Sequence, residues 1–491
     1  MRDGAPLFLG LDLGTTNIKA IVVEEDGTIV SSGSAAVGID YGGDGAAEQD
    51  IEDIWRGTRE ALSQAVAGTD GSRVRAIGVS SQGGAIQILD RAGRPAGRVI
   101  GWLDSRGGPW NSALTARLGA PWFGEHTGYP HSGSAIGQIL RLREEGSLPE
   151  GFLLGFVGDV VVGRLCGRRA HDATSLSEAG LLNPSLGTED PESLAQIGVD
   201  RACLPALLGV GEPAGGLLPQ VALQLGLPPD IPVGPAVHDQ YAAATGCGAV
   251  RAGDTMFGAG TAWVLVAVTD TITPPIAGVA LVGRHPVAGL FGQMLSMVNG
   301  GACVSWVVRT LNLGSPGVAE LDRLMAGVPA GSEGLRFRPL LSLIGGGGLL
   351  PEAAGQLDGL RLGHTPAHIV RSLVEGLACE LGRYLQLMAD GGVRVERLVM
   401  CGKAASSAVT PQIIADTTGL PVDCASLAET GSLGAAVFAR GMVSPGVPLA
   451  VLADSMKPDM RRVAPGPGRA DAEQRRRQYI QSLAPLRRTV R

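Results

Sequence analysis

The sequence predicts an α/β protein made of two halves with mixed sheets, and three observations support this prediction. Short apolar strands alternate with amphipathic helical segments along the chain. A strand–turn–strand hairpin with a Gly-Thr turn opens the sequence, and a similar hairpin recurs half a chain later. The chain has 491 residues, 45% of them apolar and 18% charged, which is enough for two or three domains with sizeable cores.

The first half opens with an expected antiparallel meander. Residues 7–13 alternate apolar with small or polar side chains, which is typical of a strand. Gly14-Thr15-Thr16-Asn17 interrupts this pattern, and a second strand is expected from Ile18 to Val23. A third strand is expected from Thr28 to Ser32. The first turn of this meander is unusually rich in glycine and threonine.

Further elements follow the meander. Helical spacing extends from Ile51 to Val66, with Asp50 as the expected cap. A strand from Val74 to Val79 leads into Ser80-Ser81-Gln82-Gly83-Gly84. Much later, an apolar strand from Ile231 to Val237 precedes a short helix of small residues.

The second hairpin predicts a duplicated domain. Residues 255–262 read as a strand ending in the turn Gly258-Ala259-Gly260-Thr261, and the strand Trp263 to Val268 follows. Thr261 lies 246 residues after Thr15, half of the chain length. Chance similarity between two short hairpins is the alternative. We place the domain boundary so that residues 1–247 and 248–491 form the two domains.

Each Gly-Thr turn can bind an anion. Consecutive backbone N–H groups that no side chain covers form a concave anion site, and a threonine hydroxyl adds a donor. Two such turns could hold the phosphates of a nucleotide. Asp12 precedes the first turn and could hold Mg²⁺ through water, since this hard cation keeps much of its hydration shell. A purely structural turn has the same sequence, so the pair of turns together with Asp12 is the stronger observation.

Asp239 is the candidate catalytic base. A kinase that acts on a hydroxyl needs a carboxylate near the γ-phosphate to accept the proton. Asp239 follows the expected strand 231–237, and the end of a strand is where a cleft forms. The alternative is that Asp239 is the N-cap of the following helix, a position that aspartate also favours.

These segments together resemble the FGGY carbohydrate kinases over nearly the whole chain. Asp12-Leu13-Gly14-Thr15-Thr16 is similar to the first phosphate motif of that family, and Gly258-Ala259-Gly260-Thr261 to the second. Trp102-Leu103-Asp104-Ser105-Arg106 resembles the segment that contacts the sugar, and His238-Asp239-Gln240 stands where the family keeps its catalytic aspartate. Gly402-Lys403-Ala404-Ala405-Ser406, followed by Gln412, resembles the adenosine-binding segment.

The resemblance implies MgATP-dependent phosphorylation of a sugar or polyol hydroxyl. It also implies two ribonuclease-H-like domains, as in actin, Hsp70 and sugar kinases, with a central interdomain cleft. The first domain would mainly bind the sugar and the second mainly ATP. Asp239 would be the base, and Asp12 (through water) and Asp239 would place Mg²⁺. The implied substrate-binding residues are Gln82, Gly83, Trp102, Asp104, Arg106, Asp239 and Gln240. The implied ATP-binding residues are Gly14, Thr15, Thr16, Gly260, Thr261, Gly301, Gly402, Lys403, Ser406 and Gln412.

The identity of the sugar stays open at the level of sequence. A ketopentose such as xylulose is the leading substrate, and another ketose, a polyol or a sugar acid is the alternative. Xylulokinases carry glutamine-methionine-histidine-glycine where this chain has only Gln82-Gly83-Gly84, and asparagine where it has Gln240. Lys403 could reach a phosphate or be a plain surface lysine. Two other readings are an ATP-binding switch like actin or Hsp70, and an inactive regulatory protein; the intact Asp12 and Asp239 disfavour the second.

Composition limits the partners. The net charge of −7 argues against general nucleic-acid binding, and we interpret the arginines at 475–477 as the solvated face of a last helix. Seven scattered cysteines without a CxxC pair are typical of reduced thiols. No apolar run approaches the ~18 residues of a membrane span. We therefore expect a cytoplasmic enzyme that contacts no membrane, with a homodimer as one assembly to test.

Overall fold

The described part of the chain forms two compact units. A computed structural model describes residues 4–342, 350 and 353–484. The first unit contains Met1–Val250, Asp270–Gly292 and Glu429–Pro458. The second unit contains Arg251–Thr269, Gln293–Ala428 and Asp459–Arg491. The units therefore interleave along the sequence, and the domain boundary after residue 247 stays a prediction.

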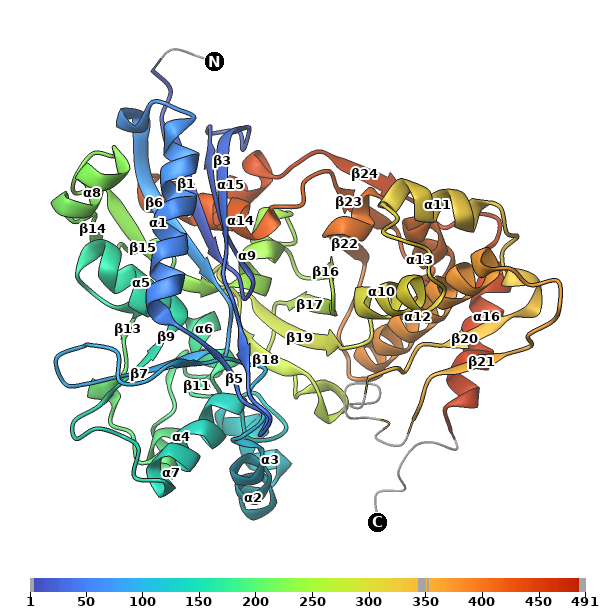
Figure 1. Cartoon of the computed structure of the whole chain (residues 1–491), viewed down its shortest axis with the longest axis horizontal. Helices are drawn as coiled ribbons and strands as arrows, with labels where there is room; N and C mark the ends of the chain where they lie inside the picture. The colour runs from blue at the N-terminus through green and yellow to red at the C-terminus, as the bar shows by residue number, and fades with distance from the viewer. Residues whose placement is uncertain (1–3, 343–349, 351–352, 485–491) are drawn as a thin grey trace. The chain divides into compact units, whose positions relative to one another are not determined.

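The main sheet of the first unit contains the expected meander (Figure 1). Strand β1 (Leu7–Leu13) pairs antiparallel with β2 (Asn17–Val23), and β2 pairs antiparallel with β3 (Ile29–Ala36). On its other side β1 pairs in parallel with β6 (Val74–Ser81), which pairs in parallel with β15 (Pro232–His238). All five strands match the sequence-based predictions to within a few residues. The sheet order is β13-β10-β15-β6-β1-β2-β3.

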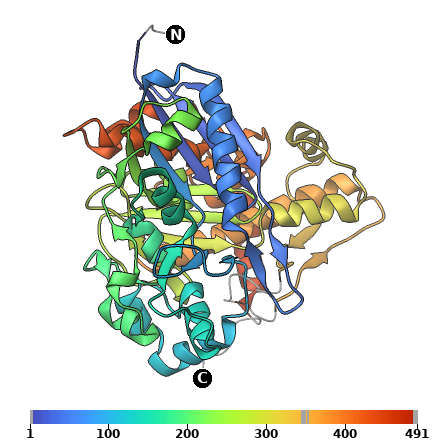
Figure 2. The ribbon, with the colours of Figure 1, turned by 60° about the vertical axis from the view of Figure 1, so that its left-hand side comes forward.

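Helices cover this sheet, and the first of them is the predicted one. Helix α1 (Ile51–Ala67) begins after Asp50, whose side chain accepts a hydrogen bond from the backbone N–H of Glu52. It packs along β2 and β3, and Figure 2 shows the same arrangement from another side. The other helices of the first unit are α2 (Gly108–Leu118), α3 (Ala120–His126), α4 (Ser134–Glu144), α5 (Val157–Cys166), α6 (Ala173–Glu178), α7 (Pro191–Ile197), α8 (Pro219–Leu225), α9 (Asp239–Gly246), α14 (Thr430–Met442) and α15 (Leu449–Met456).

Shorter strands complete the first unit. A second sheet has the order β4-β5-β8-β7-β9. Its strands and the remaining short ones are β4 (Asp40–Tyr41), β5 (Ala47–Gln49), β7 (Ile86–Leu89), β8 (Val99–Ile100), β9 (Leu153–Phe156), β10 (Ala170–His171), β11 (Leu182–Asn183), β12 (Thr188–Glu189), β13 (Ala206–Leu207), β14 (Gly215–Gly216) and β18 (Leu281–Arg284).

Helix α14 comes from late in the chain but belongs to the first unit, where it packs closely on β1, β6 and α9 (Figure 1). A Cβ atom added at Gly10 of β1 or Gly78 of β6 would lie 1.9 Å and 1.8 Å from carbonyl oxygens of α14. A Cβ atom at Gly434 of α14 would lie 1.9 Å from the carbonyl oxygen of Ala242 in α9. Only glycine permits these approaches. Helix α9 is thereby held against the sheet at the end of β15.

The second unit repeats the arrangement of the first hairpin. Strand β16 (Asp254–Ala259) pairs antiparallel with β17 (Trp263–Thr269) and in parallel with β22 (Arg397–Cys401). Strands β1, β2 and β6 are paired in the same way, which supports the prediction of two related halves. The full order of this sheet is β18-β19-β17-β16-β22-β23-β24.

The remaining elements of the second unit include the longest helix of the described residues. They are β19 (Phe291–Met297), β20 (Arg336–Arg338), β21 (Gln356–Asp358), β23 (Val422–Ala425), β24 (Met460–Val463), α10 (Gly301–Thr310), α11 (Val318–Ala326), α12 (Pro366–Asp390), α13 (Thr410–Thr418) and α16 (Arg469–Ser482). Among the helices of the described residues, α12 included, none is both long and apolar enough to cross a membrane.

The arginine run at 475–477 lies on α16 and is only partly a solvated face. The side chain of Arg477 is 68% exposed, as expected, but that of Arg476 is 17% exposed. A Cβ atom at Gly382 of α12 would lie 2.4 Å from Cδ of Arg476. The prediction is therefore wrong for Arg476, because the alkyl part of its side chain packs on α12.

Candidate active site

Asp239 is the first residue of α9 and directly follows β15. The N-cap of this helix is His238, and no side chain makes a capping hydrogen bond there. The alternative interpretation, Asp239 as the N-cap, is therefore wrong. The carboxylate of Asp239 is 30% exposed, and its Oδ1 lies 3.4 Å from Nε2 of His238.

The environment of Asp239 suits a general base. Burial raises its pKa to about 6, and hydrogen bonds from the side chain and the backbone N–H of Gln240 oppose that increase. A base whose pKa lies near the working pH is both mostly ionised and able to hold a proton. Gln240, predicted to bind substrate, thus hydrogen-bonds to the proposed base.

Asp12 lies on β1, in electrostatic contact with Asp239. Its Oδ1 accepts a hydrogen bond of 2.7 Å from Oγ of Ser80. Burial raises its pKa to about 6 and the negative charge of Asp239 contributes, while Ser80 and Lys19 oppose the increase. The described residues contain no group of three or more acidic, histidine or cysteine side chains that could hold a metal ion. Two neighbouring carboxylates nevertheless suit Mg²⁺, which binds through few protein oxygens and keeps several waters.

The predicted phosphate turn at Gly14, Thr15 and Thr16 joins β1 to β2 and is held by side chains of the same unit. Oγ1 of Thr15 accepts a hydrogen bond of 3.1 Å from Nε1 of Trp102. The carbonyl of Thr15 accepts one of 3.0 Å from Nε2 of Gln49, whose Oε1 accepts one of 3.0 Å from Nε2 of Gln82. Two residues predicted to bind substrate, Trp102 and Gln82, are thus connected to the predicted phosphate turn.

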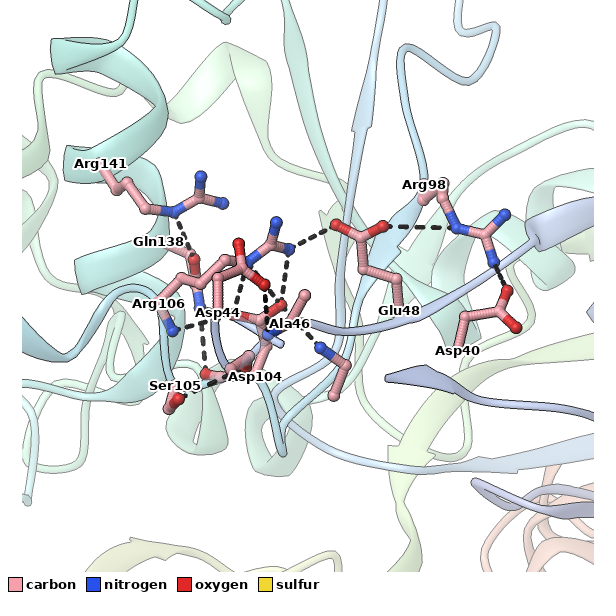
Figure 3. A network of polar contacts seen from close by, with 12 residues as sticks. Asp40, Asp44, Ala46, Glu48, Arg98, Asp104, Ser105, Arg106, Gln138 and Arg141 are labelled. Carbon is pink, nitrogen blue, oxygen red and sulfur yellow. Dashed lines mark hydrogen bonds and ion pairs between the residues drawn. The ribbon is translucent and has the colours of Figure 1, made fainter. Parts of the chain in front are cut away.

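Asp104 and Arg106 belong to a polar network rather than presenting free groups (Figure 3). The buried carboxylate of Asp104 accepts hydrogen bonds from the backbone N–H of Ala47, from Arg106, and from Nε2 of Gln138. Burial alone would raise its pKa, but these hydrogen bonds outweigh burial and hold the pKa below its usual range. The guanidinium of Arg106 also pairs with Glu48. The network continues through Arg98, Asp40 and Arg141.

Gly83 and Gly84 are covered by side chains that the sequence did not point to. A Cβ atom at Gly83 would lie 2.3 Å from Cδ2 of His238 and 2.5 Å from Cγ of Glu178. Gly84 has a φ of +70°, and a Cβ atom there would lie 3.4 Å from Cβ of Trp102. Glu178 is the last residue of α6, and nothing in the local sequence marks it as functional.

The second unit brings its own predicted residues together. The turn at Gly260 and Thr261 is exposed and follows β16. The carbonyl of Gly260 accepts a hydrogen bond of 3.1 Å from the N–H of Gly301, and that of Thr261 accepts one of 2.9 Å from the N–H of Ala302. These donors are the first residues of α10, so the turn lies at a helix N-terminus, where negative charge is favoured.

The predicted adenosine segment follows β22, the parallel neighbour of β16. Gly402 has a φ of +85°, and a Cβ atom there would lie 3.0 Å from the carbonyl oxygen of Ala259. Lys403 is exposed, and Oγ of Ser406 donates to its carbonyl. Gln412 lies on α13, where Nε2 donates to Asp416 at 2.9 Å. The close approach at Gly402 places this segment beside the 260–261 turn.

Comparison with known proteins identifies the family. The sequence pattern of the FGGY family of carbohydrate kinases, N-terminal domain, matches residues 7–246, and that of the C-terminal domain matches residues 256–441. The chain belongs to the FGGY family of carbohydrate kinases. The family predicted from the motifs is thus confirmed, and the protein is a phosphotransferase that acts on carbohydrate hydroxyls.

Two similar relatives of this FGGY kinase are a glycerol kinase and a xylulose kinase. The glycerol kinase of Rhodospirillum centenum is 30% identical over 454 residues, covering 88% of this chain and 89% of that protein. The xylulose kinase of Klebsiella pneumoniae is 26% identical over 482 residues, covering 93% of this chain and 96% of that protein. Phosphorylation of a sugar or polyol is therefore supported at the level of the class.

Solved structures confirm the fold of this FGGY kinase. The xylulose kinase from Rhodospirillum rubrum matches with a TM-score of 0.87 at 24% identity, covering 98% of this chain and 99% of the other. The glycerol kinase of Plasmodium falciparum with ADP matches with a TM-score of 0.87 at 18% identity, covering 98% of each chain. The predicted two-domain α/β fold of the ribonuclease-H-like class is thus confirmed.

Proposed function

We propose that this FGGY kinase transfers the γ-phosphoryl group of ATP to a hydroxyl of a ketopentose such as xylulose, with Asp239 as the general base. The observation that carries the proposal is the state of Asp239. Its carboxylate is not used as a helix cap, has a pKa of about 6, and lies in electrostatic contact with Asp12. A group with these properties can take the proton of an attacking hydroxyl at neutral pH.

In the proposed reaction, the acceptor is bound mainly by residues of the first unit and ATP mainly by residues of the second. Asp239 accepts the proton as the acceptor oxygen attacks, and Gln240 keeps the carboxylate oriented. Asp12 and Asp239 would hold Mg²⁺ through water, and Mg²⁺ when bound neutralises charge on the phosphates. The turns at Thr15 and Thr261 donate to phosphate oxygens. Gly402, Lys403, Ser406 and Gln412 bind the adenosine part of ATP.

Three side chains contact the sugar in this proposal, and Asp104 acts indirectly. Gln82, Trp102 and Arg106 face the acceptor, together with the Gly83 backbone. Asp104 acts through the segment that carries Trp102, because its carboxylate already accepts hydrogen bonds from Ala47, Arg106 and Gln138. Removal of Asp104 should therefore displace Trp102 rather than delete a direct contact.

Two acceptors have support from relatives. Xylulose is supported by the likeness to the xylulose kinase of Klebsiella pneumoniae. A polyol such as glycerol is the second candidate, because glycerol kinases, among them that of Rhodospirillum centenum, are as similar or slightly more so.

A screen of acceptors tests the proposed function. ADP release should be measured with MgATP and a panel of ketopentoses, ketohexoses, polyols and sugar acids, with an acceptor-free reaction as the control. We expect the highest kcat/KM for xylulose or another ketopentose. A highest value for glycerol would replace the ketopentose with the second candidate. No stimulation of ADP release by any acceptor would contradict the proposed function.

A further inference from the structure

Glu178 and His238 fill the space in which a side chain at position 83 would lie. A Cβ atom at Gly83 would overlap both residues, at 2.5 Å from Cγ of Glu178 and 2.3 Å from Cδ2 of His238. Oε1 of Glu178 would lie 4.0 Å from a Cβ atom at Gly84. The pair of glycines is thus accompanied by a carboxylate from α6 that lies beside their backbone. Trp102 and Asp239, both assigned to the acceptor side, border the same place.

The carboxylate of Glu178 has an unused hydrogen-bonding site. Its Oε2 is buried and has no hydrogen-bond partner. The hydroxyl of Tyr129 donates at 3.1 Å to the main-chain carbonyl of Glu178. A buried carboxylate oxygen that accepts no hydrogen bond lowers the stability of the fold. A ligand that donates a hydrogen bond to this oxygen would remove that cost.

A second acidic side chain, that of Asp239, interacts electrostatically with Glu178. Burial raises the pKa of the Glu178 carboxyl and Asp239 adds to the increase, while His238 and a hydrogen bond from Tyr129 oppose it. Burial raises the pKa of the Tyr129 hydroxyl, so this neighbour of Glu178 is uncharged near neutral pH.

These observations distinguish between classes of acceptor. A ligand hydroxyl can donate to the unpartnered oxygen of Glu178, which would remove the cost of leaving that buried oxygen without a donor. A ligand carboxylate at the same place cannot donate and would be repelled by Glu178 and Asp239 in a partly buried environment.

We propose that Glu178 is a specificity-determining residue, which accepts a hydrogen bond from an uncharged polyol or ketose and excludes sugar acids. The proposal rests on the proposed function and narrows it, since a sugar acid was among the open alternatives. Gly83 is required for this role of Glu178, because any side chain at position 83 would displace Glu178. Gly84 lies beside the same carboxylate.

A matched pair of acceptors and two substitutions test the proposal. The kcat and KM for a pentulose, a pentitol and the corresponding pentonate should be measured for the wild type, Glu178→Gln and Glu178→Asp. For Glu178→Gln we expect the KM for the uncharged acceptors to rise about tenfold with kcat changed less than about threefold. The preference for pentitol over pentonate should fall at least about tenfold. Glu178→Asp keeps the charge but shortens the reach, so it should raise KM and still reject the pentonate.

Glu189→Gln is the control. Glu189 lies on β12, its side chain is 5% exposed, and it pairs with Arg201, so this substitution also removes a buried carboxylate from the first unit. It should leave the preference for pentitol unchanged, and thermal unfolding of all variants shows whether each is folded. The proposal is overturned if Glu178→Gln keeps the wild-type KM and preference, or if both glutamine variants change the preference equally. A wild type without any acceptor-dependent ADP release contradicts the proposed function instead.

Discussion

At the scale of single residues, burial gives Asp239 and Asp12 their chemistry and makes both costly to the fold. Each carboxyl has its pKa raised from 3.8 to about 6 by burial, and the charge of Asp239 adds to the effect on Asp12. Because the folded state holds these protons more tightly than the unfolded chain, the free energy of unfolding falls as the pH rises from 3.8 to about 6 and stays lower above pH 6. A base that is tuned for proton transfer is therefore retained at the expense of stability.

The raised pKa of Asp239 predicts the pH dependence of the reaction. The base must be ionised to accept a proton, and it is protonated below about pH 6. We expect kcat/KM for the acceptor to reach a plateau by about pH 7.5. Below pH 6 it should fall about tenfold for each pH unit. Initial rates between pH 5 and 8, with coupling enzymes in excess, measure this profile. A flat profile down to pH 5 would contradict the pKa assigned to the base.

The sequence identified some site residues and missed others for a physical reason. Asp239 and Thr15 stand at strand ends, and such positions can be recognised from local patterns of apolar residues. Glu178 and Gln49 reach the site from a helix end and a short strand, and only tertiary contacts show their relation to Gly83 and Thr15. The sequence shows that Gly83 has no side chain. It does not show that Glu178 and His238 occupy the space beside it.

At the scale of elements, local patterns predicted the hairpins well. Strands β1, β2, β16 and β17 occur where alternation and the Gly-Thr turns placed them. Helix α1 begins after Asp50, as the capping rule indicates. The packing of α14 could not be predicted, because it depends on Gly10, Gly78 and Gly434, which lie in three separate segments that meet only after folding.

The close packing of α14 on α9 predicts a difference between two substitutions in one helix. Gly434→Ala would place a methyl group 1.9 Å from the carbonyl oxygen of Ala242 and should lower the free energy of unfolding by about 1–3 kcal/mol. It should also reduce kcat, since α9 carries Asp239. Gly441→Ala is the control, because its methyl group would meet nothing closer than 3.7 Å and alanine favours the helix. The free energy of unfolding of both variants should be measured by urea denaturation. Equal values for the two variants would contradict the close packing at Gly434.

At the scale of the whole molecule, the family and the fold were predictable and the substrate was not. Motifs that follow one another in a fixed order along the chain identify the family. They lie in turns whose backbone geometry the fold requires. Acceptor selection depends on few side chains that reach the site from separate elements, such as Glu178 on α6. The boundary after residue 247 and the division of sugar and ATP between two domains stay predictions, and the interleaved units show why a single cut point is hard to place.

The central claim is that Asp239 takes the proton of the acceptor hydroxyl, and Asp239→Asn tests it most directly. Acceptor-dependent ADP release and ATP binding by calorimetry should be measured together on this variant and on Asp53→Asn, an exposed aspartate of α1. We predict that Asp239→Asn lowers kcat by about 10²–10⁴-fold, binds ATP with nearly wild-type affinity and remains folded, while Asp53→Asn behaves as the wild type. An Asp239→Asn variant that phosphorylates the acceptor at close to the wild-type rate would contradict the claim.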